Sequence, residues 1–380
     1  MSQPIPLLIP DIPNQAAIQP YLLQIDANRH YSNFGPLVKS LETRLTASFQ
    51  QHAANPIHVT TVSSATLGLE LTLSALNLPK GSRILVPALT FVATLTAIIR
   101  TGHIPVISDI DEDSWLLTPE IAQTVLKEKK IQAAIAVATF GHPQDTLSWS
   151  KFQKASGVKV IIDAASAFGS QWATATDIPI VFSMHATKSL TAGEGGFVVS
   201  GNAKLNNLIR QLSNFGINLD THSGHPIGYI SHIGTNAKLS EYHAAVAHAS
   251  LDTWEYVAKK RTEMFHQYQH KLKELCGNAV ILQSGQPTSA PTTLSIRVGS
   301  SQVRNAIEAI CAQRNIATRR WYQPLLHHHS ARIKPMEVFS CTFAERIATD
   351  MLGLPFSTFL GDEDLNRIAT AVKDGLETQF

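Results

Sequence analysis

The chain has 380 residues, a formal net charge of +2 and only 16% charged residues. This length allows one large domain and a smaller one with an ample core, and the nearly balanced charge, without a basic block, argues against a nucleic-acid-binding protein. No run of apolar residues is long enough to predict a membrane span, and the first residues do not have the pattern of a secretory signal. The three cysteines are far apart and form no Cys-x-x-Cys motif, which favours the cytoplasm.

The first 30 residues contain several prolines and predict an extended arm with one short helix near residues 21–26. The sequence Tyr31-Ser-Asn-Phe-Gly-Pro36 follows. It predicts a turn, because Pro36 suits the first turn of the helix that we expect over residues 37–49.

From residue 57 onwards, short apolar runs alternate with amphipathic segments. The predicted strands cover residues 57–62, 84–86, 105–108, 133–138, 158–162, 178–182 and 197–199. The predicted helices between them cover about residues 65–78, 91–101, 118–129, 148–155 and 203–214. Continuous apolar strands that are separated by helices are typical of a mostly parallel sheet covered on both faces. We therefore expect an α/β fold with a seven-stranded sheet.

The rest of the chain predicts a second unit. A long helical pattern begins after Tyr242 and continues to about Leu275. A strand is expected at residues 293–298, and helices are expected over residues 303–313 and 362–376. We therefore expect a large domain over residues 1–245, including the N-terminal arm, and a small C-terminal α+β domain over residues 246–380.

The stretch from Phe182 to Gly196 carries the clearest chemical signal. Lys188 lies in a turn of small and hydroxyl residues between two apolar runs that predict buried strands. An amine that is partly removed from water loses its proton more easily and becomes a nucleophile. Lys188 is therefore a candidate to form a covalent bond with a carbonyl group.

A carboxylate is expected near this lysine. Asp163 follows the apolar strand predicted at residues 158–162, and ligands collect beyond the carboxyl ends of the strands in an open parallel sheet. A lysine that bonds to a carbonyl, together with an aspartate that can keep a pyridine nitrogen protonated, suggests pyridoxal 5′-phosphate (PLP) as the cofactor.

Two more segments follow predicted strands. Ser63-Ser-Ala-Thr66 opens a helix, where free amides and hydroxyl groups can bind a phosphate, although an ordinary helix cap explains the same residues. Phe91 could stack on a planar cofactor ring or could pack in the core. The chain contains no glycine-rich dinucleotide motif and no nucleotide P-loop motif.

The run His327-His-His329 suggests a metal site. However, adjacent residues do not share a helix face, and no cysteine or carboxylate stands beside the run at ligand spacing. We therefore expect no metal. His142 and His185 could transfer protons, but isolated histidines of this kind are more often structural.

Several of these segments resemble the signature of the DegT/DnrJ/EryC1/StrS family of PLP-dependent nucleotide-sugar aminotransferases. The main matches are Asp163-Ala-Ala-Ser-Ala, Phe182-Ser-Met-His-Ala-Thr-Lys188 and Thr191-Ala-Gly-Glu-Gly-Gly196. Further matches are Ser32-Asn-Phe-Gly-Pro36, Ser64-Ala-Thr66, Val86-Pro-Ala-Leu-Thr-Phe-Val-Ala-Thr94, Gly234-Thr-Asn236 and Leu354-Pro355. They occur in the order of the family and cover nearly the whole chain. The resemblance implies the fold of the fold-type I, aspartate aminotransferase-like PLP enzymes.

The resemblance also implies roles for individual residues. Lys188 would be the catalytic residue, which bonds to PLP and later moves a proton between the substrate and the cofactor. The residues that would bind the cofactor are Ala65, Thr66, Phe91, Asp163, Ser166, Ser183, Lys188 and, from the neighbouring subunit, Asn236. The active unit would then be a homodimer with shared sites. The residues expected to line the substrate site are Tyr31, Asn33, His185, Glu194 and Lys238.

The reaction that the resemblance implies moves an amino group from L-glutamate to a keto group of a nucleotide-linked deoxysugar. Ala65, Ser166 and Lys238 depart from the family pattern, which has glycine, glutamine or histidine, and arginine at these positions. Lysine keeps the charge of arginine but cannot bind an anion with two parallel hydrogen bonds, so the substrate can differ. A cyclitol ketone is an alternative acceptor, and a regulatory protein that binds PLP without turnover is an alternative function. Family dehydratases have histidine in place of this lysine, so Lys188 argues against dehydration.

Overall fold

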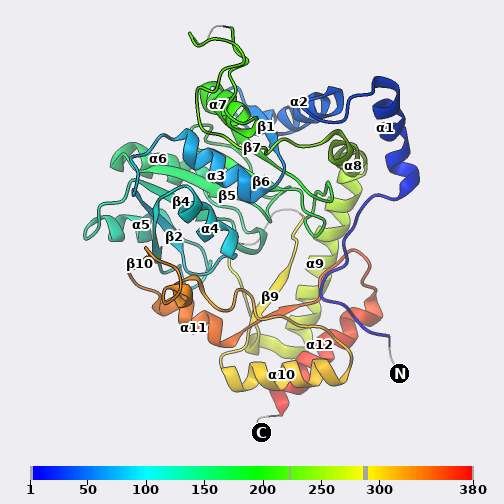
Figure 1. Ribbon diagram of the computed structural model, residues 1–380. Helices are drawn as coiled ribbons and strands as arrows, with labels where there is room; N and C mark the ends of the chain where they lie inside the picture. Colours follow the sequence, from blue (N-terminus) through cyan, green and yellow to red (C-terminus); the bar gives the residue numbers. More distant parts are fainter. Residues whose placement is uncertain (1–2, 222–223, 286–289, 379–380) are drawn as a thin grey trace.

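The computed structural model describes residues 3–221, 224–285 and 290–378 (Figure 1). Its largest element is an eight-stranded sheet in the order β1-β7-β6-β5-β4-β2-β3-β10. The strands are β1 His58–Val62, β2 Arg83–Pro87, β3 Ile104–Ser108, β4 Ala133–Val137, β5 Lys159–Asp163, β6 Ile180–Ser183, β7 Gly196–Ser200 and β10 Glu337–Val338. All neighbouring strands are parallel except β7, which is antiparallel to both β1 and β6. The predicted, mostly parallel sheet is confirmed.

This sheet has one strand more than the seven that the sequence predicted. The additional strand, β10, comes from late in the chain and pairs in parallel with β3 at the edge of the sheet. The Glu337 carboxylate holds it there, because it accepts hydrogen bonds from Arg83 Nε at 2.7 Å and Lys129 Nζ at 2.8 Å. A strand of two residues is too short to show any periodicity in the sequence.

Helices cover both faces of the large sheet. One face packs against α2 Pro36–Gln50, α5 Pro119–Leu126, α6 Thr146–Ser156 and α8 Glu241–Asp252. The other face packs against α3 Ala65–Ala75, α4 Val92–Arg100, α7 Ala203–Ser213 and α11 Thr342–Asp350. Successive side chains of a strand point to opposite faces, and in β5 both Ile161 and Ile162 are fully buried. Burial on both faces explains why the strands are continuous apolar runs in the sequence.

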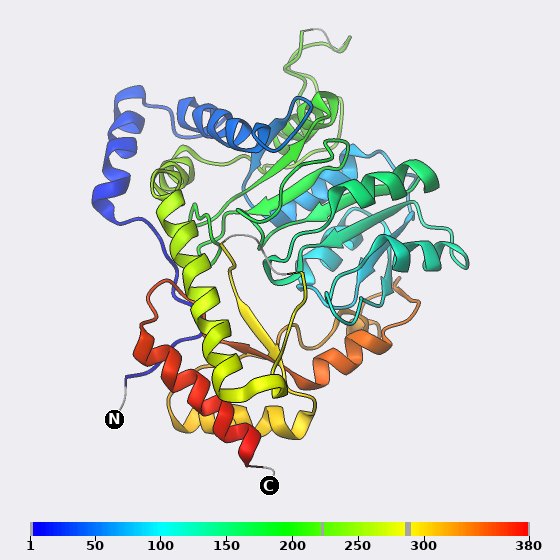
Figure 2. The same ribbon diagram turned by 180° about the vertical axis from the view of Figure 1, so that it is seen from behind.

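A smaller layer lies at the other end of the molecule (Figure 2). Strands β11 Met351–Leu354, β9 Leu294–Arg297 and β8 Ile281–Leu282 form an antiparallel sheet, which packs against α9 Trp254–Cys276, α10 Ser301–Gln313 and α12 Asp362–Glu377. Its core also contains Ile5, which pairs with Ile316, so the N-terminal segment crosses to this layer. The division into domains at residue 245 stays a prediction.

Two helical regions differ from the sequence-based expectation. Helix α1 covers Gln15–Asn28, which is longer than the short helix expected near residues 21–26. The long pattern after Tyr242 is two helices, α8 and α9, which meet at Thr253 (Figure 1). The break allows α8 to pack on the large sheet while α9 runs to the small one.

Three short 3₁₀ helices cover Thr139–Gly141, Gly277–Ala279 and Leu326–His329. Among the residues that the structure describes, no helix is both long enough and apolar enough to cross a membrane.

Candidate active site

Several chain segments with polar residues meet at the edge of the large sheet that is formed by the carboxyl ends of its parallel strands. The carboxyl ends of β1 and β6 lie beside the beginning of β7, because Val62 and Ser183 both pair with Gly196. Strand β5 ends next to β6, where Asp163 pairs with Val181. The turns that follow these strands therefore converge, at the edge where open parallel sheets bind their ligands.

Lys188 lies in the connection between β6 and β7. This connection is compact, and within it the Ala186 amide donates a hydrogen bond to Gly193 O at 2.8 Å. The half-buried lysine side chain donates a hydrogen bond from Nζ to Ser166 Oγ at 2.8 Å. Burial lowers the pKa of Lys188, and the negative charge of Asp163 partly opposes this shift. The amine is thus closer to its neutral, nucleophilic form than an exposed lysine.

Asp163 is the last residue of β5 and is only 5% exposed. Its Oδ2 accepts a hydrogen bond from Thr94 Oγ1 at 2.8 Å, and its Oδ1 accepts one from the Ala165 amide at 3.1 Å. Burial raises the pKa of Asp163, whereas the two hydrogen bonds and the charge of Lys188 act in the opposite direction. The sequence pointed to Asp163 but not to the role of Thr94.

The N-terminus of α3 lies beside Ser183, with Gly196 between them. A Cβ atom on Gly196 would come within 2.7 Å of both Ala65 N and Phe182 O, so only glycine allows this approach. In the described part of the chain, the amides of Ala65 and Thr66 have no hydrogen-bond acceptor. Two free amides at a helix N-terminus, next to a serine hydroxyl, suit an anion such as a phosphate group.

Aromatic side chains lie on the outer side of this edge. Phe91 immediately precedes α4 and is 56% exposed, so it is not a core residue. Its ring centroid lies 6.1 Å from that of Tyr322, which stacks on Phe140 at 5.3 Å. Burial and the charge of Asp163 raise the pKa of Tyr322, so its hydroxyl stays protonated. Tyr322 is a component of the site that the sequence did not reveal.

His185 and Glu194 lie on the same connection as Lys188. His185 Nδ1 lies 3.0 Å from Thr187 Oγ1, and His185 Nε2 lies 3.7 Å from Glu194 Oε1. Their side chains are 45% and 60% exposed, so a molecule that approaches the sheet edge can contact both.

Tyr31 and Asn33 lie on the turn before α2, which is fixed against the start of α8. The buried Glu241 carboxylate accepts two hydrogen bonds of 2.9 Å from amides in the first turn of α2, and the Glu241 amide donates to Tyr31 O at 3.0 Å. Both Tyr31 and Asn33 are exposed. Within the described residues, no interaction joins either side chain to Lys188.

Asn236 and Lys238 lie at the base of the segment formed by residues 214–221 and 224–236, which we call the 214–236 hairpin because two antiparallel backbone bridges join its sides. The hairpin projects beyond α7 in both views (Figures 1 and 2). Lys238 Nζ donates a hydrogen bond to Asn236 Oδ1 at 2.7 Å, and burial lowers the pKa of Lys238. Asn236 is exposed, and nothing in the described residues joins it to the Lys188 connection of the same chain.

His327 and His328 both face Glu345 of α11. Their Nε2 atoms lie 2.6 Å and 2.9 Å from Glu345 Oε1. These are hydrogen-bond distances, whereas two ligands of one tetrahedral zinc ion stand roughly 3.3 Å apart when each bond is about 2.0 Å. The buried Nδ1 of His327 also has no partner among the described residues, although a metal-bound imidazole usually donates through its second nitrogen. The expectation of no metal stays a prediction.

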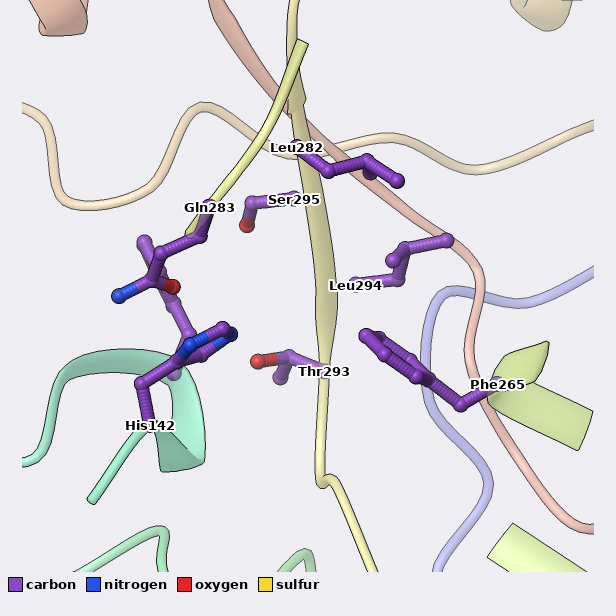
Figure 3. Close-up of a pocket in the computed structure, with 8 residues that line it drawn as sticks. His142, Phe265, Leu282, Gln283, Thr293, Leu294 and Ser295 are labelled. Atoms are coloured by element: carbon purple, nitrogen blue, oxygen red, sulfur yellow. The ribbon is translucent and has the colours of Figure 1, made fainter. Parts of the chain in front are cut away.

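His142 lines a small cavity of about 10 Å³ between the end of β4 and the small sheet (Figure 3). A cavity of this size holds about one water molecule. His142 Nδ1 lies 3.2 Å from Gly285 O, and burial lowers the pKa of the ring to about 4. The ring is therefore neutral near pH 7, which fits a structural histidine better than a proton-transfer group.

The residues at the sheet edge fit PLP. Lys188 offers an amine for its carbonyl carbon, and Asp163 offers a carboxylate for its ring nitrogen. The free amides of Ala65 and Thr66 can hold its phosphate, and the exposed ring of Phe91 can stack on its ring. A mostly parallel α/β sheet with this edge defines the chain as a PLP enzyme of fold type I.

Comparison with known proteins identifies the family. The model of the DegT/DnrJ/EryC1/StrS aminotransferase family matches residues 14–373. The chain belongs to this family and is a PLP-dependent aminotransferase. A curated relative, the dTDP-4-amino-4,6-dideoxy-D-glucose transaminase of Shigella dysenteriae, is 28% identical over an alignment 380 positions long, which covers 98% of this chain and 100% of the relative.

Solved structures confirm the fold. DesI, crystallised in the presence of its TDP-sugar product, is 28% identical with a TM-score of 0.84, and the match covers 100% of this chain and 95% of DesI. A protein of Bacillus cereus ATCC 10987, described as a PLP-dependent aminotransferase, is 26% identical with a TM-score of 0.86, and the match covers 97% of this chain and 100% of that protein.

Proposed function

We propose that this aminotransferase moves an amino group from L-glutamate to a keto group of a nucleotide-linked deoxysugar, in the synthesis of an amino sugar for a surface polysaccharide or a secondary metabolite. The observation that carries the proposal is Lys188, whose buried amine reaches Ser166 Oγ at 2.8 Å at the sheet edge where Asp163 ends β5. The compounds named for the relatives, an amino-dideoxyglucose on dTDP and a TDP-sugar, support a nucleotide sugar as the acceptor.

Lys188 has two tasks in this reaction. When bound, PLP supplies a ring that accepts electrons from the reacting carbon. Lys188 would hold the cofactor through its amine, and the same amine, when free, would take the proton from the α-carbon of the amino donor. Glutamate would leave as its 2-oxo acid, and its amino group would stay on the enzyme for the acceptor. The keto sugar takes up that group in the reverse order of steps, so that atoms and protons balance over the cycle.

The other cofactor-binding residues would hold PLP in a fixed position. Asp163 would keep the ring nitrogen protonated, and Phe91 would stack on the ring. The amides of Ala65 and Thr66, with the Ser183 hydroxyl, would bind the phosphate. Ser166, which accepts the hydrogen bond of Lys188, would orient the amine.

The active unit in this proposal is a homodimer with shared sites. Asn236 would contact the phosphate of the partner's cofactor, and Lys238 would contact an anionic group of the substrate. The 214–236 hairpin carries Tyr229, Ile230 and Ile233, whose side chains are 69%, 64% and 90% exposed. Neighbouring exposed apolar side chains are typical of protein interfaces, which supports a second copy as the partner.

The substrate would lie on the exposed side of Lys188. His185 and Glu194 of the same chain would line this space, and Tyr31 and Asn33 would line it from the turn before α2. The three cysteines are unpaired, and this supports a cytoplasmic location.

The visible absorption spectrum tests the donor half of the reaction. The protein loaded with PLP should show the yellow band of the Lys188-bound cofactor, and L-glutamate should replace it with the near-ultraviolet band of the amine form. D-Glutamate, which presents its α-proton on the wrong side, should leave the band unchanged. A band that persists in L-glutamate contradicts the proposed donor.

Acceptor candidates can be tested on the amine form prepared in this way. A nucleotide-linked keto sugar should restore the yellow band and form an amino sugar. A keto cyclitol that restores the band when keto sugars do not would establish the alternative acceptor. A protein that binds PLP but reacts with neither donors nor acceptors would be the regulatory alternative.

A further inference from the structure

Thr94, the hydroxyl partner of Asp163, is itself in contact with a second threonine, Thr90, which has none of the roles above. Thr90 and Thr94 are 2% and 1% exposed, and their Oγ1 atoms lie 3.1 Å apart. Thr94 Oγ1 lies 2.8 Å from Asp163 Oδ2. Thr94 lies in the first turn of α4, and Thr90 precedes Phe91, the N-cap residue of this helix.

The direction of the hydrogen bonds in this chain follows from the number of protons. A hydroxyl group has one proton, and an ionised carboxylate can only accept. Thr94 therefore donates its proton to Asp163, so its oxygen must accept the proton of Thr90. Hydrogen bonds in such a series polarise one another, and those that end on a charge are the strongest.

The geometry points to a hydroxyl relay, from Thr90 through Thr94 to Asp163, that keeps this carboxylate ionised and positioned for the ring nitrogen of PLP. The inference rests on the proposed role of Asp163. Thr90 and Thr94 are positioning residues, because they act through Asp163.

Asp163 needs such support because it is buried. Burial raises its pKa, and the hydrogen bond from Thr94 is the first of the effects that lower it, before those of the Ala165 amide and the Lys188 charge. The charged and titratable groups that face Asp163 are Lys188, from the connection between β6 and β7, and Tyr322, from the segment after α10. The raised pKa of Tyr322 keeps its hydroxyl neutral, and the Lys188 charge is the last of the effects that lower the pKa of Asp163, so the hydrogen bond from Thr94 is the leading stabilising contact of the carboxylate.

The side chain of Thr94 also differs from those of other threonines in the same helix. A threonine in a helix usually donates its proton to a carbonyl three or four residues earlier. Thr96 does so, with Ala93 O at 3.0 Å, and Thr101 does so at the end of the helix, with Ala97 O at 2.8 Å. Thr94 instead donates to another element of the fold, which indicates a function outside helix formation.

Five variants test the relay, and Thr90→Val removes its first hydroxyl. Thr94→Val removes the donor at nearly constant volume, and Thr94→Ser keeps it. Thr96→Val makes the same chemical change two residues away without touching Asp163. Asp163→Asn removes the charge itself.

The first readout is the Kd of pyridoxamine phosphate, which has the ring nitrogen of PLP but no bond to Lys188. Thr94→Val should raise this Kd about tenfold, because a hydrogen bond to a charged group commonly contributes at least this much. Thr94→Ser and Thr96→Val should stay close to the unmodified protein, and Asp163→Asn should raise the Kd at least as much as Thr94→Val. The measurement of this Kd uses no substrate, so its outcome does not depend on the identity of the donor or the acceptor.

The second readout is the pH midpoint of the visible band of the PLP-loaded protein. A weaker charge on Asp163 lets the ring nitrogen lose its proton, and this loss raises the pKa of the nitrogen that joins Lys188 to the ring. Thr94→Val should therefore move the midpoint to higher pH, and Thr90→Val should move it less. A purely structural role would lower thermal stability without moving the midpoint.

The relay is wrong if Thr94→Val matches Thr96→Val in both readouts while Asp163→Asn raises the Kd. If Asp163→Asn leaves the Kd unchanged, the proposed role of Asp163 fails, and the relay fails with it. If Thr94→Val does not fold, Thr90→Val decides, because it keeps the direct partner of Asp163 and should still move the midpoint upward.

Discussion

The proposed function assigns both the Lys188 edge and the 214–236 hairpin to the active site, but these two regions are built in opposite ways. At the edge, Asp163 is 5% exposed and both its carboxylate oxygens accept hydrogen bonds from the same chain. In the hairpin, Ile233 is 90% exposed and Asn236 faces solvent. A buried charge must find its partners within the protein, whereas an exposed group can use water until another molecule covers it. We interpret the edge as a half-site that is complete in one chain and the hairpin as the half that is offered to a partner.

Replacement of Lys188 should have the largest effect on the edge. Lys188→Ala should lower transamination by about 10³-fold or more, because the variant loses both the nucleophile and the proton-transfer group. PLP should still bind without the covalent bond, since the remaining cofactor contacts are unchanged. Absorption spectra and turnover measurements check this, with Lys204→Ala on the exposed side of α7 as the control. Turnover at the level of the control would remove Lys188 from the mechanism.

The second prediction concerns the stability of the cofactor-free protein. Burial raises the pKa of Asp163 in the folded protein above its value in the unfolded chain, near 3.8. Such a group stabilises the fold fully at pH values below 3.8, and this contribution is lost as the pH rises through the pKa that the group has in the folded protein. Asp163→Asn should therefore make the cofactor-free protein more stable at pH 7, on the order of 1 kcal/mol, because the variant buries no charge.

Urea unfolding between pH 4 and pH 8 measures this difference, which should shrink toward the acid end. Pyridoxamine phosphate should reverse the order at pH 7, because it stabilises the unmodified protein more. A variant that is less stable than the unmodified protein at every pH would show that Asp163 is a structural residue.

The edge was also the part that the sequence predicted best. Strand β5 and Asp163 stand out because an apolar run ends in a charge, and Lys188 stands out between two such runs. Thr94 gave no comparable signal, since a threonine near a helix start has many ordinary uses. The family match Val86-Pro-Ala-Leu-Thr-Phe-Val-Ala-Thr94 contains both Thr90 and Thr94 but implied no role for either.

Features that depend on distant packing could not be predicted. Tyr322 reaches the site from a segment without regular periodicity, and β10 consists of only two residues. Glu345 meets His327 and His328 only because α11 packs beside the 3₁₀ helix that carries them. The proposed role of the hairpin follows from the family resemblance of Gly234-Thr-Asn236 and not from periodicity or composition.

The smallest effect on the fold is expected in the hairpin. Asn236→Ala should change the free energy of unfolding by less than about 0.5 kcal/mol, because the side chain is exposed and bonds locally to Lys238. If Asn236 contacts the partner's cofactor, the same variant should lower turnover about tenfold, as expected for the loss of a hydrogen bond to a charged phosphate. Unchanged turnover would separate the hairpin from the active site.

The most direct test of the two half-sites is a mixture of two variants that are each impaired in turnover. Chains with Lys188→Ala and chains with Asn236→Ala are combined, unfolded and refolded together, and their turnover is compared with that of each variant alone. Half of the randomly formed dimers are hybrids, and each hybrid has one site with both residues intact, so activity should return to about a quarter of the unmodified level. A mixture no more active than the average of the two separate variants would contradict the shared site.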